Sequence, residues 1–151
     1  MNVVFISPHF PEYYHNFCSR LKDRGVNVLG VGDCPYDMIS DETKNSLTEY
    51  YYVGSLENYD EVYRACAYFS SQYGKIDWIE SENEYWLELE ATLRRDFNVT
   101  TGPQIQDMRW MKYKSAMKEV YKSAGLKVAD YIKLDTLDEA LEFTKKNGYP
   151  V

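Results

Sequence analysis

The sequence predicts an α/β protein built on a doubly wound, mostly parallel sheet. One observation is that segments typical of strands and segments typical of helices alternate from the N-terminus onward, which favours crossover connections between parallel strands. The other is that the first strand-like segment, Val3-Val4-Phe5-Ile6, is apolar at every position. An unbroken apolar run is typical of a strand that is covered on both faces, as strands of parallel sheets are.

The further elements of the sheet follow from periodicity and from glycine stops. Apolar residues at steps of three and four predict helices, and Gly25 and Gly74 each stand where such a pattern ends. After the first strand we expect, in order, a helix at 12–24, a strand at 26–32, a polar loop at 35–46, a strand at 50–53, a helix at 56–73, a strand at 76–79, a helix at 85–95 and a short fifth strand at 97–100.

The pattern changes near Gly102-Pro103, where we place the boundary between a sheet domain at 1–103 and a second domain that begins at 104–151. The second part predicts a long helix at 105–124 that Gly125 ends, a strand at 128–134, a helix at 137–146 and the beginning of a strand at 149–151. Because the chain ends inside an apolar strand without a partner, we expect it to be a piece of a longer protein.

Composition argues against several classes of function. The 151 residues carry a formal net charge of −7 with dispersed basic residues, which argues against binding to nucleic acid. No apolar run approaches the roughly 20 residues that cross a bilayer, and the N-terminus has no basic signal region, so we expect no membrane partner and a cytoplasmic location. The three cysteines have no CxxC spacing and are expected to be reduced thiols.

Ligands of open parallel sheets bind beyond the carboxyl ends of the strands, near the point where the strand order reverses. Three loops, at 7–10, 32–36 and 80–83, follow predicted strands. Our preferred substrate contacts are His9 in the first loop and Glu82 in the last, with Asn83 beside it. A structural interpretation competes for the last loop, because Ser81-Glu82-Asn83-Glu84 matches a capping box. The sequence leaves both interpretations of Glu82 open.

Several standard motifs are missing. A classical dinucleotide site needs glycines between the first strand and its helix, and that turn has none. There is no Walker loop, GxSxG elbow or HExxH sequence. The spacing of His9, His15 and Cys18 fits no zinc site, so we predict no metal ligands in this chain.

A lysine of the predicted long helix is a candidate for phosphate binding. Met117, Val120 and Tyr121 share one arc of that helix with Ala124, and Lys114 lies at the border of the arc. An ammonium group there could reach into a cleft and bind a phosphate. The competing interpretation is a lysine that packs its aliphatic stem and keeps its charge in water.

The segment from Lys114 to Leu126, with Lys114 eleven residues before Gly125 of the Ala124-Gly125 pair, resembles the start of the ATP-grasp domain in ATP-grasp ligases. The later Gly148-Tyr149-Pro150-Val151 resembles the next motif of these enzymes, and Ser81-Glu82-Asn83 is similar to a sequence in their biotin carboxylase branch. The family also includes the carbamoyl phosphate synthase large subunit. The resemblance implies a Rossmann-like pre-ATP-grasp domain, followed by the first elements of an incomplete ATP-grasp domain.

The resemblance also implies an activity. Such enzymes form an acyl phosphate from a carboxylate and ATP, and an amine or similar nucleophile then attacks it. Lys114 would contact the ATP phosphates, with Lys112 as the alternative, because Tyr113 stands where the family usually has an acidic residue. Magnesium ligands are expected beyond Val151, so the 151 residues alone should be inactive. The partners would be ATP, a small carboxylate and an amine.

Two further expectations complete the prediction. The strands at 128–134 and 149–151 would have unpaired edges, which predicts either raised mobility after residue 125 or a homodimer contact. The alternatives to a ligase are a stand-alone α/β binding or interaction module, receiver-like or flavodoxin-like, and the N-terminal half of a nucleotide-sugar transferase.

Overall fold

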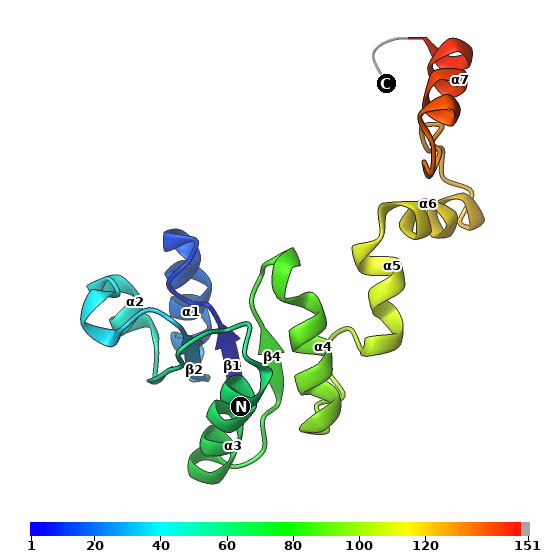
Figure 1. Cartoon of the computed structure of the whole chain (residues 1–151). Coiled ribbons are helices and arrows are strands. Elements are labelled where there is room, and N and C mark those ends of the chain that lie inside the picture. The colour runs from blue at the N-terminus through cyan, green and yellow to red at the C-terminus, as the bar shows by residue number, and fades with distance from the viewer. Residues whose placement is uncertain (149–151) are drawn as a thin grey trace. The chain divides into compact units, whose positions relative to one another are not determined.

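The computed structural model describes residues 1–148 and divides the chain into two compact units, Met1–Met108 and a second unit that begins at Arg109 (Figure 1). The predicted strand at 149–151 lies outside the described residues. The first unit is a doubly wound α/β fold on a parallel sheet, which confirms the predicted fold class. The assignment of residues 104–151 to the start of an ATP-grasp domain stays a prediction.

The sheet of the first unit has four parallel strands in the order β3-β2-β1-β4. Their bounds are Asn2–Ile6 for β1, Asn27–Gly32 for β2, Glu49–Tyr52 for β3 and Trp78–Glu80 for β4. Val3 pairs with Val28 on one side and with Trp78 on the other. The direction in which strands are added reverses between β1 and β4, so the switch point lies between these two strands.

Alternate residues of β1 enter two different cores. Val4 and Ile6 pack in the larger core with α3 (Tyr59–Tyr73) and α4 (Leu87–Asp96), whereas Phe5 packs in a smaller core with Cys18. Cys18 belongs to α1 (His15–Lys22), which follows a 3-10 turn, η1 (Glu12–Tyr14). Helices therefore contact both faces of the sheet, as parallel sheets require.

The predicted polar loop at 35–46 is wrong, because it contains a 3-10 turn, η2 (Tyr36–Met38), and a short helix, α2 (Asp41–Ser46). The Ser40 side chain caps this helix by accepting a hydrogen bond from the Thr43 amide at 3.1 Å. Such a cap satisfies one of the amides that a helix start leaves unpaired. The helix has no apolar stripe, so hydrophobic periodicity could not reveal it.

The predicted fifth strand at 97–100 is also wrong. Asn98 adopts a positive φ of 52°, and the Val99 amide donates to the Arg94 carbonyl at 2.7 Å, so the segment folds back on the end of α4. Side chains occupy the edge of β4 that a fifth strand would use: Arg94 Nε donates to the Ile79 carbonyl at 3.1 Å, and Thr101 Oγ1 donates to the Asp77 carbonyl.

The helix predicted at 105–124 is broken into η4 (Ile105–Asp107), α5 (Met108–Lys112) and α6 (Lys114–Ser123). Tyr113 stands between α5 and α6 in an extended conformation, with φ −93° and ψ 113°. Neither glycine nor proline marks this break in the sequence. Gly125 ends the helical region with a φ of 75°, as predicted.

In the second unit, the predicted strand at 128–134 is wrong, because no strand of the described chain pairs with it. This segment packs through side chains instead: the Tyr131 hydroxyl donates to the Ser115 carbonyl at 3.3 Å, and the Lys118 and Lys122 ammonium groups lie 4.6 and 4.9 Å from the Tyr131 ring centroid. The last predicted helix is confirmed as α7 (Leu137–Asn147). Within residues 1–148, no helix is long and apolar enough to cross a membrane.

Candidate functional site

The loops that follow β1 and β4 carry the same unusual backbone feature at the switch point. Ser7 has a φ of 57° and Glu82 a φ of 56°, although neither is a glycine. A Cβ makes this left-handed region costly by about 1 to 3 kcal/mol, and such residues cluster at functional sites. The backbone therefore marks the loops at 7–10 and 80–83 as a candidate binding site.

A buried tyrosine joins the two loops. The hydroxyl of Tyr14, in η1, donates to the carbonyl of Glu82 at 2.5 Å, and the residue is 7% exposed. In the first loop, the Ser7 hydroxyl donates to the Phe10 carbonyl at 3.1 Å. These bonds fix the position of the Glu82 backbone relative to the β1 loop.

A buried charged cluster lies beneath the loop that follows β4. Glu90 and Arg94, both in α4, are 0% and 1% exposed. Arg94 Nη2 lies 3.0 Å from Glu90 Oε2 and 3.4 Å from Glu80 Oε2. The Ser81 hydroxyl, which is also buried, donates to Glu90 Oε1. The cluster thus connects α4 to the end of β4.

This cluster contains two carboxyl groups and one guanidinium group. Burial and the neighbouring Glu80 raise the pKa of Glu90, while Ser81 and Arg94 lower it, and together these effects bring the pKa to about 7. Glu90 therefore holds a proton until near pH 7, and the Glu80 carboxyl group is the second oxygen partner of Arg94 in the cluster. Glu80 in turn accepts from the backbone amides of Ser81 and Glu82 at 3.2 and 3.3 Å, so the cluster fixes the backbone of this loop.

Arg94 also reaches the end of the first unit. Its Nη1 donates to the carbonyl of Pro103 at 2.8 Å, while its Nε donates to the carbonyl of Ile79. Sequence reasoning missed this role, because charged residues are ordinarily exposed. The detectable signal is the Glu90–Arg94 spacing of four residues beside the apolar Ala91 and Leu93, which places both charges on the buried side of α4.

The predicted capping box from Ser81 to Glu84 is wrong. Asn83 is the cap of η3 (Glu84–Trp86), and its Oδ1 accepts from the Tyr85 amide at 3.0 Å. Ser81 is not available for capping, because its hydroxyl binds Glu90 and accepts from the Asn83 amide. Of the predicted substrate contacts in this loop, Asn83 thus uses its side-chain oxygen in capping, whereas the Glu82 side chain is exposed.

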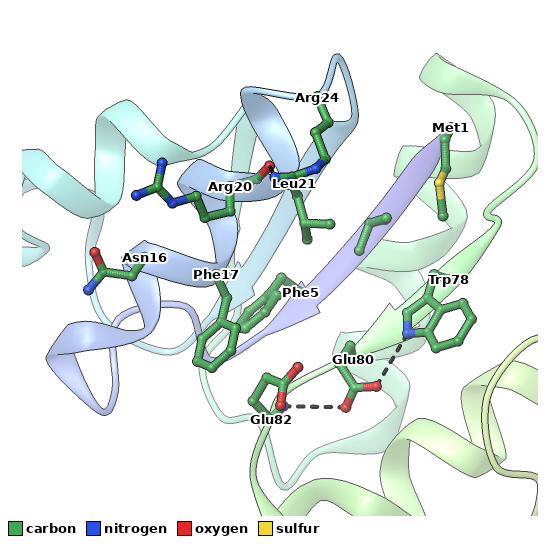
Figure 2. A pocket seen from close by; sticks show the side chains of 11 residues that line it. Met1, Phe5, Asn16, Phe17, Arg20, Leu21, Arg24, Trp78, Glu80 and Glu82 are labelled. Atoms are coloured by element: carbon green, nitrogen blue, oxygen red, sulfur yellow. Dashed lines mark hydrogen bonds between the residues drawn. The ribbon is translucent and has the colours of Figure 1, made fainter.

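The Glu82 side chain lies at a groove of about 560 Å³ on the sheet (Figure 2). Burial and the neighbouring Glu80 both raise the pKa of Glu82. The groove is lined by side chains of β1, α1 and the end of β4: Met1, Val3, Phe5, Asn16, Phe17, Arg20, Leu21, Arg24, Trp78, Glu80 and Glu82. The exposed Glu82 carboxyl group can bind a cationic ligand group at this groove, while Arg20 and Arg24 of the same lining carry the opposite charge.

His9 lies in different surroundings. Its Nε2 is 3.4 Å from Asp33 Oδ1, and it lines a cavity of about 300 Å³ with residues of the β2 loop and α2 such as Cys34 and Thr43. Burial lowers the pKa of His9, while Asp33 raises it. The structure therefore places His9 and Glu82 at different cavities, although both belong to the loops of the switch point.

The remaining predicted site residue, Lys114, is the first residue of α6 and is exposed, while Lys112 ends α5. A phosphate-binding role for Lys114 stays a prediction. Within residues 1–148, no three His, Cys, Asp or Glu side chains gather where they could hold a metal ion.

No family model matches the sequence, and no curated protein matches it. Solved structures do match its fold. A biotin carboxylase domain of a single-chain bacterial carboxylase aligns with 98% of this chain at 16% identity and a TM-score of 0.68. An L-amino acid ligase from Bacillus licheniformis aligns with 96% of the chain at 15% identity and a TM-score of 0.57.

A third structure is the biotin carboxylase domain dimer of the Hydrogenobacter thermophilus 2-oxoglutarate carboxylase, solved with MgADP, ADP and bicarbonate. It aligns with 98% of the chain at 21% identity and a TM-score of 0.63. This chain spans 35%, 41% and 33% of the lengths of the three structures, in the order given. The matches confirm, at the level of the fold, the resemblance to ATP-grasp enzymes of the biotin carboxylase type.

Proposed function

We propose that the polypeptide containing this chain is an ATP-dependent carboxylate–amine ligase. The observation that carries the proposal is the fold, which extends over 96% to 98% of the chain in a ligase and in two biotin carboxylase domains. The strained loops at the switch point add support, because they lie where this class of sheet binds ligands. The activity is proposed for the whole polypeptide, since the chain spans only part of each of these structures.

In the proposed reaction, a carboxylate oxygen attacks the γ-phosphorus of ATP, and ADP leaves. The ammonium group of the amine substrate loses a proton to solvent, and its nitrogen then attacks the carbonyl carbon of the acyl phosphate. Inorganic phosphate leaves, and the nitrogen loses a second proton. Magnesium would neutralise charge on the ATP phosphates when bound. Its ligands are proposed to lie beyond Val151.

Lys114 is our candidate for the phosphate contact. As the first residue of the ten-residue helix α6, it combines an ammonium group with the positive end of the helix dipole. Both features attract phosphate oxygens. Lys112 lies in another helix and is the matched control.

The acceptor substrate is proposed to bind at the loops that follow β1 and β4. The Glu82 carboxylate, beside Glu80, would hold the ammonium group of an amine substrate, and His9 would contact the part of the substrate that reaches the β2 loop. Asn83 would contribute mainly by holding the loop, because its side-chain oxygen caps η3.

The test follows an isotope through the reaction. With an ¹⁸O-labelled carboxylate substrate, acyl phosphate formation transfers one ¹⁸O atom to the released phosphate, which mass spectrometry detects. Lys114→Ala should reduce kcat/KM for ATP by about 10- to 100-fold, the scale of a lost hydrogen bond to a charged group, and Lys112→Ala should have little effect. Unlabelled phosphate, or no ADP with any carboxylate and amine pair, would contradict the proposal and favour a non-catalytic binding module.

A further inference from the structure

The backbone of the loop at 80–83 is bonded to the side chain of Glu80, the last residue of β4. Glu80 Oε1 accepts from the amides of Ser81 at 3.2 Å and Glu82 at 3.3 Å, and Glu80 Oε2 accepts from the Trp78 indole at 3.2 Å (Figure 2). Glu82 has a φ of 56°, a conformation that persists only where its surroundings hold it. A movement of the Glu80 carboxyl group would therefore change the conformation of this loop.

The carboxyl groups of Glu80 and Glu90 meet at one guanidinium nitrogen. Arg94 Nη2 lies 3.4 Å from Glu80 Oε2 and 3.0 Å from Glu90 Oε2. Arg94 itself is fixed by two backbone carbonyls, because its Nε donates to Ile79 at 3.1 Å and its Nη1 donates to Pro103 at 2.8 Å. One positive group cannot balance two ionised carboxyl groups, and an unbalanced buried charge costs several kcal/mol. A proton on the cluster removes this imbalance.

The proton belongs to Glu90 and also binds Glu80. A hydrogen bond between the two carboxyl groups contributes to the raised pKa of Glu90, together with burial and the charge of Glu80, while Ser81 and Arg94 lower it. Two carboxyl groups can form such a bond only when one of them is protonated. Other titratable groups of α4 and of the elements around it are exposed or bound elsewhere: Glu84 and Glu88 are exposed, Tyr14 donates to the Glu82 carbonyl, Tyr59 to Asp96 and Tyr85 to Glu57, and Asp107 accepts from the Gln104 amide.

Loss of this proton to solvent acts on Glu80 more than on the other two groups. It removes the hydrogen bond between the carboxyl groups and adds a negative charge beside Glu80. The Glu80 side chain is 24% exposed, whereas the side chains of Glu90 and Arg94 are 1% exposed each. Glu80 can therefore turn into water, where its carboxyl group is well solvated, while Glu90 and Arg94 have no such route.

We propose that the proton on Glu90 is a pH-dependent switch for the loop at 80–83. While Glu90 is protonated, Glu80 stays at Arg94 and holds the loop. When Glu90 ionises, Glu80 turns to solvent, and the amides of Ser81 and Glu82 lose their acceptor. The consequence for substrate rests on the proposed function: an amine should bind Glu82 more weakly at the higher pH, because the loop is no longer preformed. The switch itself uses only the residues of this cluster and does not depend on the reaction.

The test is an NMR titration of the 151-residue chain labelled with ¹³C and ¹⁵N. The side-chain carboxyl carbon of Glu90 reports its ionisation, and the amides of Ser81 and Glu82 report the conformation of the loop. With a pKa of about 7, Glu90 passes from about one tenth to about nine tenths ionised between pH 6 and pH 8. We expect both amide resonances to move over this interval, with the same midpoint as the carboxyl carbon of Glu90.

Glu90→Gln keeps the shape of the side chain but cannot ionise, so the transition at Ser81 and Glu82 should be lost in this variant. The control Glu42→Gln, at an exposed site in α2, should keep it.

Three results would overturn the proposal: loop amides that stay in place while Glu90 titrates, a transition that persists in Glu90→Gln, or a Glu90 carboxyl carbon that does not titrate between pH 6 and pH 8. The first and third need no variant, so they decide the matter even if Glu90→Gln does not fold. A loop that switches as expected in a polypeptide without ligase activity would refute only the proposed function.

Discussion

Replacing Glu90 by glutamine tests whether this buried carboxyl group is protonated in the folded chain. Glu90 is fully buried, and its partners are Arg94, Ser81 and Glu80. Glutamine has nearly the same shape and carries no charge, so it imitates the protonated acid. If Glu90 is protonated near neutral pH, the substitution removes little that stabilises the fold, and it removes the cost of ionising the group at higher pH.

The size of the effect follows from the pKa of Glu90, which burial raises from 4.5 to about 7. A carboxyl group with a raised pKa binds more protons in the folded state than in the unfolded state, so the free energy of unfolding falls as pH rises between these two values. At about 1.4 kcal/mol per pKa unit, Glu90 should cost about 2 to 3 kcal/mol of stability between pH 5 and pH 8. Glu90→Gln should therefore stabilise the chain progressively over this interval.

The assay is urea unfolding of the wild type, Glu90→Gln and the control Glu42→Gln at several pH values from 5 to 8. Glu42 is exposed, so its substitution should leave the pH dependence of unfolding unchanged. The reasoning fails if Glu90→Gln is less stable than the wild type at pH 8, or if the difference between the two proteins does not grow with pH. Either result would mean that Glu90 is ionised and that its attraction to Arg94 outweighs burial.

Three further predictions concern other groups. Arg94→Met should destabilise the fold by about 3 to 5 kcal/mol in urea unfolding, because it leaves buried acceptors without their donor. The control Arg95→Met, at an exposed site, should change stability by less than about 1 kcal/mol. Equal losses of stability in the two variants would contradict the structural role of Arg94. In an NMR titration, the pKa of His9 should lie below 6.5, because burial lowers it. Asp33→Asn should lower the His9 pKa further, since Asp33 favours the charged imidazole. A rise of the His9 pKa in this variant would contradict the interaction between the two side chains. A thiol reagent should modify Cys34 before Cys18 and Cys66, because these two thiols are buried and burial raises the pKa of each to about 12. Preferential labelling of Cys18 or Cys66 would contradict this and would show that the α1 or the α3 side of the fold opens readily.

Apolar patterning predicted the sheet correctly because the pattern reports burial. Val3-Val4-Phe5-Ile6 is covered on both faces in the structure, as its unbroken apolar run indicated. The same argument failed at 97–100. Val99 is buried, but it packs beside the end of α4 and not in a strand, and the side chains of Arg94 and Thr101 take the hydrogen bonds of the β4 edge. Hydrophobicity alone cannot distinguish these two reasons for burial.

The candidate site was predicted less completely than the fold. The loop positions followed from the topology of parallel sheets, but the positive φ of Ser7 and Glu82 leaves no pattern in a single sequence. The charged cluster of Glu90 and Arg94 was missed because charged residues are ordinarily exposed. The break at Tyr113 was missed for a related reason, since no helix-breaking residue stands there.

The hydrogen bonds along the outer edge of β4 also determine where this sheet can grow. An exposed strand edge is a template for another strand, and unprotected edges lead to aggregation. At β4, the carbonyls of Asp77 and Ile79 already receive donors from Thr101 and Arg94, so an incoming strand finds both acceptors occupied. Intermolecular strand addition should therefore begin at β3, the opposite edge, and removing the Arg94 guanidinium group would open a second route to aggregation.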